Sequence, residues 1–406
     1  MDPLKRPPLT RLRQELFANP FDGLVTVLLI TGLAAAASHL LHWALAQAHW
    51  AVIQANSTLF AVGRYPIEQQ WRLWLLVTLL AGATGLSWGV LRGLPLQERP
   101  IPVPWPRNDR IAAVVLVGLC LWTPAALGLT LAIQARWWAL TALLLLVRWL
   151  VGRSAKTLGK PVAMAIPLLW PLLYLVGMVL IGGGVGLVPV GANEWGGLLL
   201  TLVEASFAIL LSVPLGVLLA LGRRSALPLL RWGSIAYIEF IRGAPLITLL
   251  FLGQNILGFL LPGGMAPDRV WRAAWILTFF SAAYLAEAVR SGLAAVPRGQ
   301  LEAARSLGLS LPQALARVVL PQALRIALPA TVGQFISLLQ DTTVLSLIGL
   351  FDLLGTARSV MANPLYLGKS AEVYLTLAVL FWCCCAALGL GSRALERRLN
   401  PPILGR

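Results

Sequence analysis

The stretch that decides the fold runs from residue 296 to residue 310 and reads VPRGQLEAARSLGLS. It is polar, and it lies between two very apolar segments near residues 270 and 350. Pro297 interrupts the preceding helix, and residues 300–307 then contain strong helix formers with apolar positions on one stripe. Gly308 stands where a helix C-terminus needs a residue that tolerates a positive φ. The stretch therefore predicts a short helix outside the bilayer.

A second short helix is predicted directly after it. Ser310-Leu311-Pro312-Gln313 has the capping-box pattern, in which Ser caps the helix and Gln follows three residues later. This helix is expected to run to Leu320, and Pro321 is expected to end it. The sequence thus predicts two short amphipathic helices joined by a sharp turn, each with an apolar side available for contact with another protein.

The composition places these helices in a membrane protein. Hydrophobic residues make up 58% of the 406 residues and charged residues 12%, against about 45–50% and 25% in soluble domains. The mean hydropathy is +0.79. Many stretches approach the roughly 20 apolar residues that cross a bilayer as a helix, whereas barrel strands would alternate apolar and polar residues. We predict an all-α, polytopic helical membrane protein with about eight to ten transmembrane helices.

Ten spans fit the hydropathy, and the two short polar helices lie between the eighth and the ninth. The fourth span is short and follows a tight turn, so counts of nine or eight stay open. The expected spans are 23–46, 71–93, 111–133, 137–152, 163–185, 196–222, 233–261, 271–292, 324–350 and 372–393.

The net charge of +16 is better explained by membrane topology than by nucleic acid binding. Lys and Arg collect in alternate loops, as they do on the cytoplasmic side of membrane proteins. This asymmetry predicts that both termini face the cytoplasm and that residues 1–22 form a basic cytoplasmic tail. The apolar segment after the tail is too long for a cleaved signal and has no cleavage site, so we expect a membrane anchor.

The spans fall into two regions. Residues 23–190 form about five nearly featureless apolar helices, and residues 191–400 form about five more that carry polar residues at particular places, with the polar loop at 297–321. Cys383, Cys384 and Cys385 lie together in an apolar helix, and the three histidines lie in or beside the first span. Neither group has the spacing of metal ligands, so we expect no metal site.

The polar loop resembles that of a known family. Glu302-Ala303-Ala304, then Gly308, then Leu320-Pro321, resembles the Glu-Ala-Ala loop of permease subunits of binding-protein-dependent ABC importers. The resemblance covers about residues 191–396, and residues 23–190 resemble the N-terminal extension of long permeases. Further segments resemble the polar amino acid (histidine/glutamine-type) branch, namely 196–202, 242–246, 283–287, 290–292, 321–325, 334–338 and 341–343.

The resemblance implies a role and a set of partners. The loop would form coupling helices that dock on a separate ATPase, and the residues implied in this coupling are Glu302, Ala303, Ala304, Gly308, Leu309 and Pro321. The implied partners are two ATPase subunits, a second permease subunit (identical or paralogous), an external solute-binding protein, a polar amino acid and membrane lipid. Nucleic acid is not among them. The implied location is the bacterial cytoplasmic (inner) membrane.

The chain is expected to have no ATP site of its own. Residues 363–370 read NPLYLGKS, which invites comparison with a phosphate-binding loop. The first glycine of that motif is replaced by Asn363, and no strand precedes the segment. We therefore expect no cofactor in this chain, no enzymatic activity of its own, and ATP-Mg on the partner ATPase.

Four polar residues inside the spans are candidates for the translocation path. Gln334, Ser337 and Asp341 follow one another at spacings of three and four, so they lie on one stripe of the ninth span. Glu204 lies in the sixth span, where an ionisable side chain is costly and is expected to face a cavity or a partner. For the stripe, lining of the path and packing between helices are equally good interpretations.

Two further pairs of charged residues are predicted to be structural. Glu239 and Arg242 are three residues apart near the cytoplasmic start of the seventh span, and Glu287 and Arg290 repeat that spacing at the end of the eighth. Both spacings fit ion pairs that fix helix packing.

Together these features predict the transmembrane permease subunit of an ATP-driven ABC importer for polar L-amino acids. The alternative is a self-sufficient secondary amino acid transporter, which would be expected to have inverted repeats. No convincing repeat relates residues 23–190 to residues 191–393. A membrane-embedded enzyme would need clustered His, Cys or paired carboxylates, which the sequence does not offer.

Overall fold

The computed structural model describes residues 16–17, 19–93, 113–114, 116–118, 130–260 and 267–399. This part of the chain is helical, as predicted, and its extended segments pair only in isolated bridges such as that between Gly63 and Trp195. The elements are α2 (Pro20–His42), η2 (Trp43–Gln47), α3 (Ala51–Ala55), α4 (Ser57–Val62), η3 (Ile67–Gln69), α5 (Gln70–Gly93), α7 (Leu131–Gly182), η4 (Ala192–Glu194), α8 (Gly197–Arg223), α9 (Pro228–Gly243), α10 (Leu246–Leu260), α11 (Arg269–Ala295), α12 (Arg298–Ser306), α13 (Leu311–Ala314), η5 (Leu315–Val319), α14 (Leu320–Asp341), η6 (Thr342–Ile348), α15 (Leu353–Met361), η7 (Pro364–Tyr366) and α16 (Ser370–Leu399).

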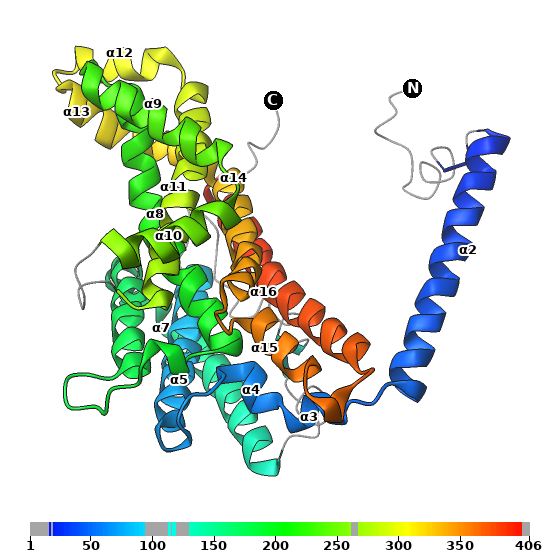
Figure 1. The fold of residues 1–406 in the computed structure, drawn as a ribbon. Coiled ribbons are helices and arrows are strands. Elements are labelled where there is room, and N and C mark those ends of the chain that lie inside the picture. Colours follow the sequence, from blue (N-terminus) through cyan, green and yellow to red (C-terminus); the bar gives the residue numbers. More distant parts are fainter. Residues whose placement is uncertain are drawn as a thin grey trace.

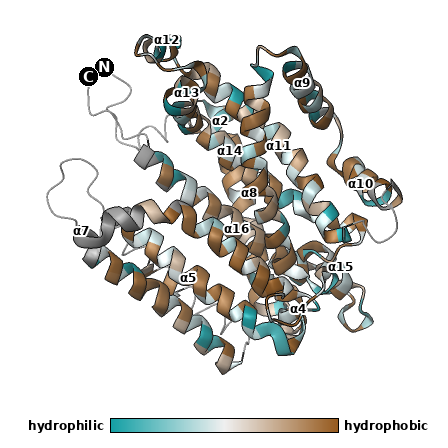
Figure 2. Cartoon of the chain, turned by 90° about the vertical axis from the view of Figure 1, so that its left-hand side faces the viewer, coloured by the Kyte–Doolittle hydropathy of each residue, from teal (hydrophilic) through white to brown (hydrophobic). Residues whose placement is uncertain are grey.

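The helices form one elongated body with a separate arm (Figure 1). Helices α12, α13 and α9 lie at one end of the body, and α3, α4 and α15 lie at the other. We call these the α12 end and the α15 end. Apolar residues predominate along α5, α8, α14 and α16 between the two ends, while hydrophilic residues are frequent in α9 and α12 (Figure 2). Helix α2 is joined to the body at the α15 end and stands apart from it over its length.

Seven helical segments in the described residues are long and apolar enough to cross a membrane, and a bent pair of helices makes an eighth. The seven coincide with the predicted first, second, fourth, fifth, sixth, ninth and tenth spans, and the bent pair coincides with the seventh. The predicted third span, 111–133, lies largely outside the described residues. The fold is therefore a polytopic helical membrane protein with about seven to eight candidate spans, which confirms the predicted class.

Helix α11 corresponds to the predicted eighth span but is not among the seven apolar segments. It carries Arg269, Arg272, Glu287 and Arg290, which lower its hydropathy. It is nevertheless a central helix of the body, because it packs against α8, α9, α10 and α14 and buries Leu277 and Leu285 among other residues.

The predicted seventh span, 233–261, is broken rather than continuous. Helices α9 and α10 meet at an angle of 107°. Ala244 between them adopts extended backbone angles, with φ −91° and ψ 136°. Pro245 explains the break, because its ring disfavours helical geometry in the preceding residue and it has no N–H to donate.

The predicted fourth and fifth spans both lie in α7, whose two halves run in opposite directions along α5. Trp137 in the first half contacts Trp74, with ring centroids 6.1 Å apart. Gly177 in the second half packs against Leu76, near the same point of α5. A straight helix would separate residues 137 and 177 by about 60 Å. The chain therefore reverses direction inside α7, and both halves pack on α5.

The N-terminal region and the residues after 190 share one hydrophobic core. Tyr65, Ile181 and Val190 pack in the same buried cluster as Leu200 and Leu277. A Cβ atom added to Gly63 would lie 2.4 Å from the Cα of Gly196, so the two backbones touch directly at this point. Within the N-terminal region, the buried Arg72 donates from its guanidinium to the carbonyl of Val188 over 2.8 Å.

At the α15 end, α15 is tied to the start of α8. The N–H of Leu353 donates to the hydroxyl of Thr201 over 3.0 Å. The side chain of Asp352 caps α15 by accepting from the N–H groups of Leu354 and Gly355, each at 3.0 Å. Burial raises the pKa of Asp352 to about 7, although these hydrogen bonds act in the opposite direction.

Candidate coupling site and translocation path

Helix α12 and the turn that follows it have the geometry that the sequence predicts. Helix α12 follows Pro297 and ends at Ser306. Gly308 has a φ of +81°, in the left-handed region. The N–H of Ser310 donates to the side-chain oxygen of Gln313 over 3.1 Å, which is half of the predicted capping box at the start of α13. The two helices therefore lie side by side around a sharp turn at the α12 end (Figure 1).

The candidate coupling residues divide between a buried and an exposed side. Ala304 is buried, and its neighbour Leu301 packs against a core cluster that includes Val296 and Val319. Glu302, Ala303, Gly308 and Pro321 are exposed, and Leu309 is half-buried. Two large apolar side chains, Leu307 and Leu311, also face outward, at 83% and 49% exposure. The exposed side thus presents apolar surface that another protein could cover.

The prediction that Pro321 ends the second short helix is wrong. The chain stays helical from Leu311 to Asp341, through α13, the π-helical turn η5 and α14. Pro321 lies in the first turn of α14. A proline ring normally clashes with the carbonyl four residues earlier, and the preceding π-helical turn widens the helix at that point. The N–H of Leu320 donates to the carbonyl of Leu315 in this turn. The second short helix is therefore continuous with the ninth span.

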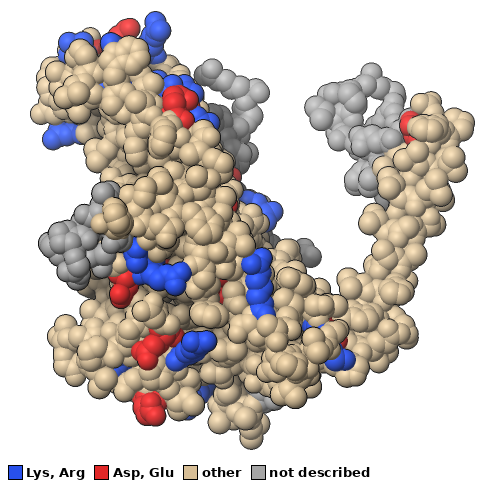
Figure 3. Space-filling model, in the orientation of Figure 1, with Lys and Arg blue, Asp and Glu red and all other residues tan. Residues whose placement is uncertain are grey.

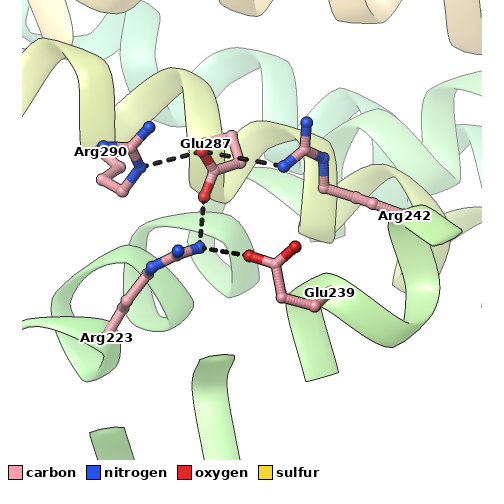
Figure 4. Close-up of polar contacts among 5 residues, drawn as sticks. All are labelled: Arg223, Glu239, Arg242, Glu287 and Arg290. Atoms are coloured by element: carbon pink, nitrogen blue, oxygen red, sulfur yellow. Dashed lines mark hydrogen bonds and ion pairs between the residues drawn. The ribbon is translucent and has the colours of Figure 1, made fainter. Parts of the chain in front are cut away.

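Five charged residues from three helices form a connected ion cluster near the α12 end (Figure 4). Glu287 of α11 lies at its centre and is 17% exposed. Its carboxylate is 2.7 Å from the guanidinium of Arg223, 3.8 Å from that of Arg242 and 2.9 Å from that of Arg290. Arg223 also lies 3.2 Å from the more exposed Glu239. The cluster links the end of α8 to α9 and α11.

This geometry corrects one of the two predicted pairs. Glu287 and Arg290 are paired at the predicted spacing. Glu239 and Arg242 are not paired with each other, since Glu239 contacts Arg223 and Arg242 contacts Glu287. Sequence reasoning missed Arg223 because it lies 64 positions from Glu287. The available signal was that both residues end predicted spans on the same side of the membrane.

The predicted path residues of α14 lie on one stripe of that helix. Gln334 and Asp341 are half-buried and Ser337 is exposed. Next to them, the amide of Gln340 lies 3.9 Å from the sulfur of Cys385 on α16. Glu204 differs from this group. It is fully buried in α8, and neither carboxylate oxygen has a hydrogen-bond partner in the described part of the chain.

Comparison with known proteins shows which family the chain belongs to. Residues 212–401 match the family model described as "Binding-protein-dependent transport system inner membrane component". The chain is 34% identical, over 96% of its length and 93% of the relative, to the glutamate/glutamine/aspartate/asparagine transport system permease protein BztC of Rhodobacter capsulatus. It is 42% identical to the inner membrane amino-acid ABC transporter permease protein YhdY of Escherichia coli, over 57% of this chain and 64% of that one.

A solved structure described as an amino acid ABC transporter with histidines matches 50% of this chain and 92% of its own, with 32% identity and a TM-score of 0.45.

The family model and the match to BztC define a membrane permease subunit of a binding-protein-dependent ABC importer. Within that class, the chain belongs to the polar amino acid permease family, in its long form. It is an inner membrane, multi-pass protein, and ATP hydrolysis belongs to a separate subunit. Its partners include an ATPase, a binding protein and an amino acid. The alternative of a self-sufficient secondary transporter is thereby set aside.

Proposed function

We propose that this chain forms the translocation path of an importer for glutamate, glutamine, aspartate and asparagine. The observation that carries the proposal is the identity of 34% to a permease named for these four amino acids, over 96% of the chain. The match to BztC includes the N-terminal extension. The match to YhdY covers only 57% of the chain, so it cannot include the extension in full.

The assembly that we propose contains two ATPase subunits and a second permease subunit. The chain itself needs no cofactor, because ATP-Mg binds to the ATPases. The ATPase contact is the exposed side of α12 and α13, with Glu302, Ala303 and Gly308 beside the outward-facing Leu307 and Leu311. The binding protein docks at the α15 end, on the opposite side of the membrane.

Coupling in this proposal depends on the continuous helix from Leu311 to Asp341. A force applied to α13 by the ATPase moves α14 as well, because no loop lies between them. Gly292 of α11 packs directly against the backbone of Ala323 in α14, so the two helices are expected to shift together. The stripe of Gln334, Ser337 and Asp341 on α14 is then brought to one side of the membrane or the other.

The topology that we propose places the α12 end in the cytoplasm. In Figure 1, α2 begins toward that end and α16 ends toward it, which supports a cytoplasmic position for both termini. Arg242 of the ion cluster belongs to α9, which lies at the same end in Figure 1, as the distribution of positive charge in membrane proteins favours.

Uptake by the reconstituted importer tests the proposed substrate class. The full permease is expressed with its ATPase and binding protein, reconstituted in proteoliposomes and supplied with ATP. We expect uptake of radiolabelled glutamate, and we expect unlabelled glutamine, aspartate and asparagine to compete with it. A basic amino acid such as lysine is the matched competitor that should have little effect. Uptake of lysine in preference to the four amino acids would contradict the proposal.

A further inference from the structure

A polar group that the sequence analysis did not single out lies where α10, α11 and η6 meet. Arg269 donates from its guanidinium to the carbonyl of Ile348, the last residue of η6. Arg272, one turn further along α11, donates to the backbone carbonyl of Gln254 in α10. The side-chain amide of Gln254 donates in turn to the carbonyl of Arg269 over 2.7 Å. Three elements are therefore held together by two guanidinium groups and one amide.

Two of these side chains, Arg272 and Gln254, keep polar atoms that form no hydrogen bond. The Nε atom of Arg272 and the side-chain oxygen of Gln254 are buried and have no hydrogen-bond partner among the described residues. Gln254 is only 9% exposed. Within the same residues, no carboxylate lies at ion-pair distance from Arg269 or Arg272, whereas each arginine of the ion cluster around Glu287 pairs with a glutamate. Buried groups of this kind are costly unless something binds them.

The orientation of the Gln254 amide is fixed by its neighbour. A backbone carbonyl can only accept, so the NH₂ group must face the carbonyl of Arg269. The oxygen then points away from that contact and remains a free acceptor. Two cationic donors with no counter-charge thus stand beside one neutral acceptor.

This pattern is complementary to an amino acid. A guanidinium binds a carboxylate through charge-assisted hydrogen bonds, and an amide oxygen accepts from an ammonium group. A lone anion would use the arginines but would leave the oxygen of Gln254 without a donor. A zwitterion satisfies both kinds of group.

The place of the group in the fold connects it to the path. The stripe of Gln334, Ser337 and Asp341 runs along α14 and leads directly into η6. Arg269 holds the last carbonyl of η6, so the polar group lies beyond the end of that stripe, on the side away from α12 and α13. A substrate that enters from the binding protein would meet it before the stripe.

We propose that Arg272, with Arg269 and Gln254, binds the α-carboxylate and the ammonium group of the transported amino acid on its way into the path. This inference rests on the proposed function, because it assigns a site for the proposed substrates. Arg272 is the residue that contacts the carboxylate, and Gln254 accepts from the ammonium group.

One other source of an anion must be distinguished. Further along the face of α11 that carries Arg272 lie Ile276 and Phe279, which line an apolar groove of about 230 Å³ together with Leu252 and Ile256 of α10. An anionic phospholipid could place its headgroup on Arg272 and an acyl chain in this groove. The experiment therefore includes an arm for lipid.

The test compares two ligands that differ only in the α-carboxylate. Glutamine and 4-aminobutanamide are titrated by calorimetry into the purified permease–ATPase complex without the binding protein. We expect wild type to prefer glutamine by roughly tenfold or more, the range for a charge-assisted hydrogen bond. Arg272→Gln should abolish this preference, and Arg272→Lys should restore part of it. Gln254→Leu should lower the affinity for both ligands by a similar factor, because both carry the ammonium group.

Arg358→Gln is the matched control, because Arg358 is an exposed arginine on α15. It should leave the preference for glutamine unchanged. The proposal is overturned if Arg272→Gln keeps the preference. Phosphatidylglycerol is also added to the delipidated wild-type complex and to the delipidated variant. The proposal is overturned as well if the lipid displaces glutamine from wild type and if Arg272→Gln removes this displacement without changing the affinity for glutamine.

Failure of this inference and failure of the proposed function are separable. If wild type imports the four amino acids but Arg272→Gln imports them with unchanged preference, only the site is wrong. If wild type imports none of them, the proposed substrate class is wrong.

Discussion

Helices α2 and α11 are of similar length but have opposite surroundings. No residue of α2 is buried, and the segment is long and apolar enough to cross a membrane. Helix α11 is packed on several sides and is not among the apolar segments. In Figure 3, α2 bears almost no charged side chain, while the visible face of the body carries many. A helix in contact with lipid must be apolar all round, whereas a helix enclosed by protein can carry charges that other side chains satisfy.

Function in such a chain is therefore to be sought in helices that protein encloses, and not only in the most apolar ones. Hydropathy finds the helices that face outward, and it underrates the helix that connects the candidate sites. Helix α11 bears Arg272 near one end and Glu287 near the other, and it leads directly into α12. Three experiments test the contrast between the two helices.

The largest effect is expected in the turn between α12 and α13. Gly308 has a φ of +81° and open space around it, so a side chain there meets no clash but does meet backbone strain. Gly308→Val should reduce ATP-driven uptake by about tenfold or more, because a β-branched residue rarely adopts this conformation. Gly308→Asn should retain most uptake, because Asn tolerates the left-handed region. Both should insert normally, as measured by the yield of purified complex. Full uptake by the Val variant would show that α12 and its turn take no part in coupling.

A smaller effect is expected from the ion cluster. Glu287→Gln removes the carboxylate that faces Arg223, Arg242 and Arg290. The positive charges of these three guanidinium groups are then offset by little negative charge. We expect the unfolding temperature in detergent to fall by roughly 2–4 °C. Glu239→Gln is the control, because Glu239 is 57% exposed and makes one ion pair, so its loss should cost well under half as much. An equal fall for the two variants would mean that burial of Glu287 has no special importance.

The smallest effect is expected from the loss of α2. Deletion of residues 1–42 removes α2 but keeps Trp43, which packs against Trp50 at a centroid distance of 6.3 Å. Because α2 buries nothing in the chain, the unfolding temperature of the isolated permease in detergent should change by less than about 2 °C. A fall of 5 °C or more would show that α2 packs on the body and would end the contrast with α11.

Much of the architecture could be predicted because it depends on local rules. The spans follow from apolar runs, the turn follows from Gly308, and the start of α13 follows from Ser310 and Gln313. The failures have a common cause. Pro321 continues the helix because a π-helical turn precedes it, and Arg223 reaches Glu287 from a distant segment. Such features depend on packing between elements, which neighbouring residues do not encode.

The group around Gln254 illustrates the same limit. A glutamine in an apolar helix and two arginines at a helix start each have an ordinary explanation on their own. Only the bend between α9 and α10, at 107°, and the packing of α10 on α11 bring them together. Residues 242–246 resemble a family motif, but the motif itself does not indicate that the chain bends at Pro245.

The contact between Gly63 and Gly196 has a consequence for how this long form can evolve. With a separation that leaves no room for even one methyl group, neither position can accept alanine without moving both backbones. At this crossing the extension and the residues after 190 can therefore change only together, because a side chain on either glycine would force both backbones apart.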